Sequence, residues 1–134
     1  MSKLIKKTGL VGGGVIGGGW GARLVLNGVD VKVFDPSDTA ERTLKEMLAN
    51  AELAYSKLTM APLVKQGNIE FVDSIEKAVK NVQFIQESVP ENPDFKRSII
   101  NEIAHFAPES TLICSSTCLL YTSDAADEGL GVDL

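Results

Sequence analysis

The chain has 134 residues, of which 44% are hydrophobic and 23% charged, and its formal net charge is −5. This composition is typical of one soluble globular domain that is large enough for a core of its own. The negative charge argues against a surface for nucleic acid or an anionic membrane. No apolar segment is long enough for a signal peptide or a membrane span, so we expect a cytoplasmic protein.

Apolar runs alternate with helical patterns along the chain, which predicts a parallel sheet covered on both faces. The expected strands are residues 7–11, 29–34, 69–72, 82–86 and 111–115. The expected helices are residues 15–26, a long helix that reaches Leu58 before a break at Ala61-Pro62, a short helix capped by Asp73, and residues 94–106. Right-handed crossovers then give a Rossmann-type doubly wound α/β sheet in the order 3-2-1-4-5.

A glycine-rich turn follows the first expected strand and reads G-x-G-x-x-G from Gly12 to Gly17. In this motif Gly12 permits the tight turn, Gly14 leaves the backbone open to a pyrophosphate, and Gly17 allows close packing of the helix. The N-terminus of the following helix favours negative charge. The motif predicts a dinucleotide site at the carboxyl ends of strands one and four.

Asp35 stands at the tip of the second expected strand, about 20 residues beyond the glycines, where a carboxylate accepts hydrogen bonds from the adenosine ribose. Because an acid at this place repels a 2′-phosphate, NAD is expected rather than NADP. The pattern also fits a glycine-rich turn with an unrelated loop aspartate. The same turn would also fit a free-standing dinucleotide-binding module that catalyses no reaction. It would fit the FAD-binding half of a flavoprotein as well.

Further polar residues lie near the same edge. Glu91 and Lys96 flank the loop after the fourth strand, and by themselves such charges are more typical of an exposed surface. Hydroxyls of Ser115, Ser116 and Thr117 end the fifth strand, where they either reach a ligand or form a turn. His105, the one histidine, is expected on the surface, and Cys114 in a buried strand. The cysteine spacing matches no metal site.

Taken together, these segments resemble the 3-hydroxyacyl-CoA dehydrogenase family, and within it the L-carnitine dehydrogenase branch. The resemblance covers about residues 7–117. It is carried by Gly12–Gly17, Val33-Phe34-Asp35, the Phe84–Glu91 run, Lys96 and Ser115–Thr117, and for the branch also by Leu26–Val31 and Phe71–Ile75.

The resemblance implies an NAD-dependent oxidoreductase that transfers a hydride from a secondary alcohol. The implied substrate is L-carnitine, oxidised to 3-dehydrocarnitine, or alternatively a 3-hydroxyacyl-CoA. It also implies a homodimeric full-length protein. The cofactor-binding residues implied are Gly12, Gly13, Gly14, Val15, Ile16, Gly17, Asp35, Glu91 and Lys96.

The sequence departs from the family after Thr117, where Cys118 replaces an expected polar residue. Residues from Cys118 onward read as a translation of the transposase mosaic end and adapter used in sequencing libraries. We therefore expect residues 1–117 to be an incomplete NAD-binding domain and residues 118–134 a non-native tail. The family's catalytic histidine, its partner acid and its helical C-terminal domain follow this point, so we expect no catalytic residue and no turnover in this chain.

Overall fold

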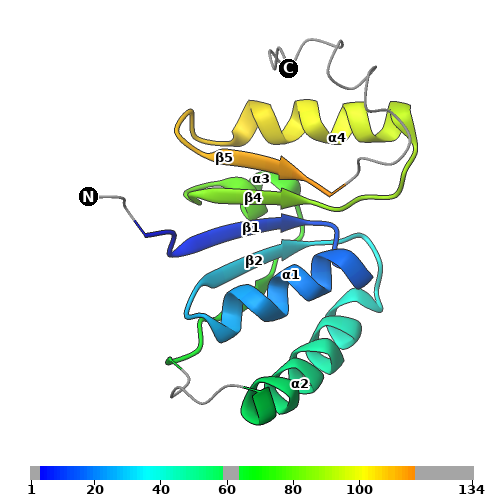
Figure 1. The fold of residues 1–134 in the computed structure, drawn as a ribbon. Coiled ribbons are helices and arrows are strands. Elements are labelled where there is room, and N and C mark those ends of the chain that lie inside the picture. The colour runs from blue at the N-terminus through cyan, green and yellow to red at the C-terminus, as the bar shows by residue number, and fades with distance from the viewer. Residues whose placement is uncertain (1–3, 59–63, 117–134) are drawn as a thin grey trace.

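A computed structural model describes residues 4–58 and 64–116 of the chain (Figure 1). The expected helix break at Ala61-Pro62, residue Thr117 and the expected tail lie outside the described residues. The described elements follow in the order β1 (Lys7–Val11), α1 (Val15–Leu26), β2 (Asp30–Phe34), α2 (Ala40–Leu58), β3 (Ile69–Phe71), α3 (Ile75–Val79), β4 (Phe84–Glu87), α4 (Pro93–Phe106) and β5 (Leu112–Ser115).

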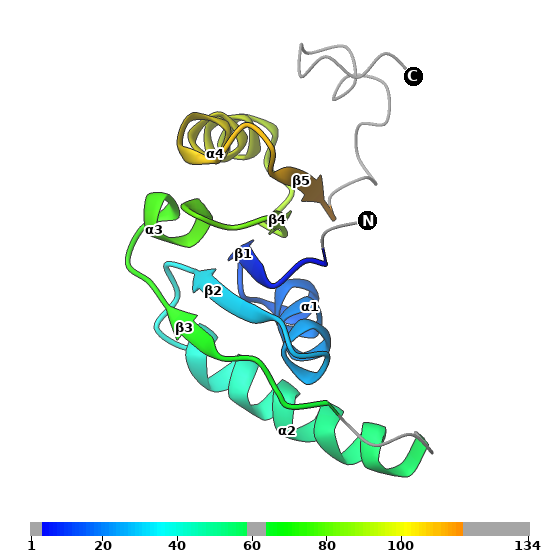
Figure 2. The same ribbon diagram turned by 90° about the vertical axis from the view of Figure 1, so that its left-hand side faces the viewer.

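The five strands are all parallel and lie in the order β3-β2-β1-β4-β5, which confirms the predicted topology. Figure 2 shows α1 and α2 on one face of the sheet and α3 and α4 on the other. The crossover after β1 and the crossover after β4 therefore lie on opposite faces of the sheet. The carboxyl ends of β1 and β4 meet at the point where the strand order reverses, as expected for a doubly wound fold.

Each face of the sheet buries its own apolar cluster. Under α1 and α2 the cluster consists of Leu10, Val25, Val31, Val33 and Leu44. Under α3 and α4 it consists of Val11, Ile75, Ala78, Val79, Val82, Ile85, Ile99 and Ile103. Because successive side chains of a strand point to opposite faces, neighbouring β1 residues Leu10 and Val11 serve different clusters.

Two local expectations were wrong. Ser74, not Asp73, caps α3: its Oγ accepts a hydrogen bond from the Lys77 backbone N–H. The Asp73 carboxylate instead accepts from Lys77 Nζ at 2.8 Å, and this hydrogen bond holds the pKa of Asp73 below its usual range. Cys114 is exposed rather than buried, because β5 is an edge strand and all four of its residues are exposed.

No helix within residues 4–58 and 64–116 has the length and apolar character needed to cross a membrane.

The register of β4 and β5 offers a matched test of the core, because Ile85 pairs with Ile113. Ile85 is fully buried, whereas Ile113 is 41% exposed. Ile85→Ala should lower the free energy of unfolding by about 2–5 kcal/mol, since it leaves a cavity under α3 and α4. Ile113→Ala should cost less than about 1 kcal/mol. Chemical denaturation measures both, and equal losses would contradict the difference in burial between the inner strand β4 and the edge strand β5.

Candidate functional site

The glycine turn between β1 and α1 is held by very close backbone approaches. Gly12 adopts φ +100°, and a Cβ there would lie 2.6 Å from the Ser88 carbonyl oxygen after β4. A Cβ on Gly17 would overlap the Gly12 carbonyl oxygen. Only glycine fits at these two positions, so the turn, the first turn of α1 and the loop after β4 pack against one another as a unit.

Gly14, the residue before α1, has a different environment. A Cβ at Gly14 would meet no protein atom within 4 Å. Gly14 is also the N-cap of α1, where no side chain caps the helix and no acidic residue stands in the first turn. The N-terminus of α1 therefore has no side-chain cap and lies next to an open position at Gly14, which suits an anion.

Asp35 follows β2 and joins the glycine turn. Its Oδ2 accepts a hydrogen bond from the Gly13 N–H at 2.6 Å, and its Oδ1 accepts from the Ser37 N–H at 2.8 Å. The Gly12 N–H also donates to the Phe34 carbonyl at 2.9 Å. The partly buried carboxylate of Asp35 is thereby fixed directly beside the turn, as predicted from the spacing of the motif.

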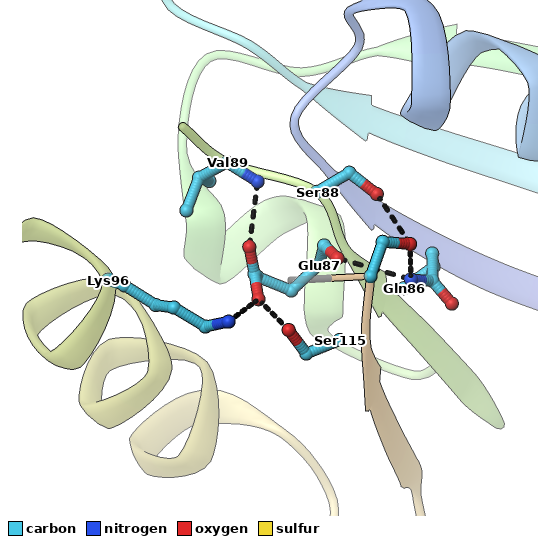
Figure 3. Close-up of polar contacts among 7 residues, drawn as sticks. Gln86, Glu87, Ser88, Val89, Lys96 and Ser115 are labelled. Atoms are coloured by element: carbon cyan, nitrogen blue, oxygen red, sulfur yellow. Dashed lines mark hydrogen bonds and ion pairs between the residues drawn. The ribbon is translucent and has the colours of Figure 1, made fainter. Parts of the chain in front are cut away.

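Glu87, the last residue of β4, holds a fully buried carboxylate on the α4 side of the sheet (Figure 3). Its Oε1 accepts from the Val89 N–H at 2.7 Å. Its Oε2 accepts from the Ser115 hydroxyl and lies 3.7 Å from Lys96 Nζ. One carboxylate thus joins the loop after β4, the end of β5 and the first turns of α4.

A second polar network lies on the opposite face of β4 (Figure 3). Gln86 Nε2 donates to the Ser116 Oγ at 2.6 Å and to the Glu87 carbonyl at 3.1 Å. Ser88 Oγ donates to the same Ser116 Oγ at 3.3 Å. The hydroxyls of Ser115 and Ser116, for which the sequence left both a ligand and a turn open, therefore already bond to groups of β4 and its loop.

The other predicted site residues lie near the carboxyl ends of the strands, but their side chains differ in how far they are exposed to solvent. Val15 and Ile16 are 78% and 57% exposed at the start of α1, an unusual place for two apolar side chains unless a ligand covers them. Glu91 is exposed in the loop before α4. The Lys96 side chain is only 16% exposed, so it is not an ordinary surface lysine. His105 is exposed near the end of α4, which leads into the start of β5 and so lies away from the carboxyl ends of the strands.

Glu87 is the residue that sequence reasoning did not assign to the site, although it lies in the run that carries the family resemblance. A signal was present: Glu87 comes two residues after the buried Ile85 on the same strand, so it faces the same apolar cluster. An acid at an inward-facing strand position requires partners.

Two further observations limit where ligands can bind. Among residues 4–58 and 64–116, no three His, Cys, Asp or Glu side chains are grouped as a metal site would need. A separate open depression lies between α2 and the segment at β3, lined by Lys45, Leu48 and Phe71 among others. It contains none of the predicted site residues.

These features define a Rossmann-type dinucleotide-binding domain. Residues 7–128 match the family model of the 3-hydroxyacyl-CoA dehydrogenase, NAD binding domain. The chain belongs to this family, and NAD is its cofactor.

Curated relatives carry a more specific name. The chain is 52% identical over 124 residues to the L-carnitine dehydrogenase/betainyl-CoA thioesterase of Rhizobium meliloti, covering 92% of this chain and 25% of that protein. It is 42% identical over 120 residues to the L-carnitine dehydrogenase of Pseudomonas putida, covering 90% of this chain and 37% of that protein. The chain therefore spans about a quarter to two fifths of the length of these relatives.

Solved structures agree on the fold. A diketoreductase superposes with a TM-score of 0.76 at 24% identity, over 94% of this chain and 46% of that one, which shows the fold alone. An NAD+-dependent dismutase, 5-formyl-3-hydroxy-2-methylpyridine 4-carboxylic acid 5-dehydrogenase, superposes with a TM-score of 0.73 at 30% identity, over 85% and 37% of the two chains.

The close approach at Gly17 can be tested against a second glycine of α1. Gly17→Ala should destabilise the chain by about 1–3 kcal/mol or more, because the new methyl group displaces the turn. Gly19 is exposed on the same helix, and its Cβ would meet only Met47 Cε at 3.9 Å. Gly19→Ala should stabilise the chain by up to about 1 kcal/mol through helix propensity. Thermal unfolding measures both, and a neutral Gly17→Ala would contradict the packing described.

Proposed function

We propose that the chain binds NAD across the carboxyl ends of β1, β2 and β4, with the pyrophosphate at Gly12–Gly17. The observation that carries this proposal is the open space at Gly14. At Gly12 and Gly17 a side chain would clash with the protein backbone. At Gly14 no protein atom would clash with a Cβ, so a bound ligand is the proposed reason for glycine there. The uncapped first turn of α1 beside it supplies amide N–H groups for phosphate oxygens. Exposed Val15 and Ile16 add apolar surface that a bound cofactor covers.

In this proposal Asp35 binds the adenosine ribose. Hydrogen bonds from Gly13 and Ser37 fix the Asp35 carboxylate next to the turn, so the cofactor meets a negative charge that is already in position. Ribose hydroxyls donate to such a carboxylate, whereas a 2′-phosphate is repelled by it. The same geometry therefore supports NAD over NADP.

Glu91 and Lys96 are proposed contacts for the nicotinamide half of the cofactor. Both lie beyond β4, on the far side of the strand-order reversal from Asp35. Lys96 supports this assignment better than Glu91 does, since its side chain is largely withdrawn from solvent at this edge.

We further propose that the chain is the NAD-binding part of a longer cytoplasmic, homodimeric L-carnitine dehydrogenase, which oxidises L-carnitine to 3-dehydrocarnitine. The L-carnitine dehydrogenases at 42% and 52% identity support this substrate over a 3-hydroxyacyl-CoA. Hydride transfer also needs a group that takes the hydroxyl proton within hydrogen-bond reach. Among the described residues the one histidine, His105, lies at the end of α4, away from the carboxyl ends of the strands where NAD is proposed to bind.

Gly14→Ala tests the cofactor site without disturbing the fold. The new methyl group meets no protein atom, so the melting temperature should change by no more than a few degrees. It occupies the proposed pyrophosphate position, so the dissociation constant for NAD should rise at least about tenfold. Calorimetric titration measures the affinity, with Gly19→Ala as the matched control. Unchanged NAD affinity in Gly14→Ala would contradict the proposed phosphate position.

The substrate is tested with the full-length product of the source gene. NADH formation, followed by its absorbance, should depend on L-carnitine, and 3-hydroxybutyryl-CoA should give much less. The 134-residue chain alone should form no NADH with either compound. Preference for the acyl-CoA would favour the alternative substrate, and carnitine-dependent NADH formation by the short chain would contradict the assignment of catalysis to residues outside it.

A further inference from the structure

The buried carboxylate of Glu87 needs an explanation beyond packing. A charge removed from water is costly unless donors surround it, and an apolar side chain of similar volume would avoid this cost. Ile85 and Val11 show that the neighbouring positions on this face are apolar. Glu87 interrupts that surface at the carboxyl edge, where the proposed NAD site lies.

The partners of Glu87 come from three separate segments. The Val89 N–H belongs to the loop that leads to Glu91, the Ser115 hydroxyl to the end of β5, and the Lys96 ammonium to α4. Figure 3 shows all three converging on the two carboxylate oxygens. Two of these segments carry the residues proposed for the nicotinamide half of the cofactor.

Lys96 gains most from such a partner. A lysine has a flexible four-carbon stem and a compact charge, so ordering it for a ligand costs conformational entropy. Glu87 Oε2, 3.7 Å from Lys96 Nζ, holds that charge in one place before a ligand arrives. Pre-organisation of this kind lowers the cost of binding.

We infer that Glu87 is the positioning residue of the nicotinamide half of the site: its carboxylate fixes the Lys96 ammonium for NAD. The inference rests on the proposed NAD site. Glu87 itself contacts the cofactor through no atom, and its effect on affinity passes through Lys96.

A double-mutant cycle separates positioning from simple support of the fold. Glu87→Gln, Lys96→Met and the double variant of the 134-residue chain are titrated with NAD by amide chemical-shift changes, which reach millimolar dissociation constants. Glu87→Gln should raise the dissociation constant about tenfold when Lys96 is present and less than about twofold in the Lys96→Met background. A merely structural Glu87 would raise it by the same factor in both backgrounds, and that result overturns the inference.

Glu102→Gln is the control for the loss of one negative charge, because Glu102 is exposed on the same helix as Lys96. It should change the dissociation constant by less than about twofold. If circular dichroism shows that Glu87→Gln does not fold, Ser115→Ala takes its place in the cycle, since it removes one donor and leaves the carboxylate. It should weaken NAD binding about threefold, again only when Lys96 is present.

The unsubstituted chain distinguishes failure of the cofactor site from failure of the positioning role. If it shows no shift changes with NAD, the proposed cofactor site fails and the role of Glu87 fails with it. If it binds NAD but the cycle is additive, only the role of Glu87 fails.

Discussion

The backbone approach between the glycine turn and the loop after β4 is the constraint on which the rest of the site depends. Gly12 lies against the Ser88 carbonyl, and Gly17 lies against Gly12. The Ser88 N–H also donates to the Val11 carbonyl at 2.8 Å. These contacts bring the start of α1 to the place where the strand order reverses, and a side chain at Gly12 or Gly17 would push them apart.

Two carboxylates stabilise this arrangement from either side of β1. Asp35 bonds to the amide of the glycine turn on the β2 side, and Glu87 bonds to its own loop, β5 and α4 on the other. The functional difference follows from exposure. Asp35 is partly exposed and remains able to meet a ligand, whereas Glu87 is fully buried and acts through its neighbours.

Sequence reasoning recovered the strand order and the Asp35 position because both depend on local patterns: apolar runs, glycines and spacing along the chain. It missed what depends on neighbours distant in sequence. Cys114 was expected to be buried because its strand is apolar, but burial depends on whether a strand lies at the edge. The ion pair of Lys96 joins it to Glu87, which lies on another element. The cap of α3 was misplaced by one residue because Asp73 and Ser74 are both good caps.

Amide chemical-shift perturbation by NAD shows where the cofactor binds on the chain. Binding at the proposed site should give saturable shift changes at Gly12–Gly17, around Asp35 and in the first turn of α4. Changes confined to the depression between α2 and β3, or no saturable change at all, would contradict it.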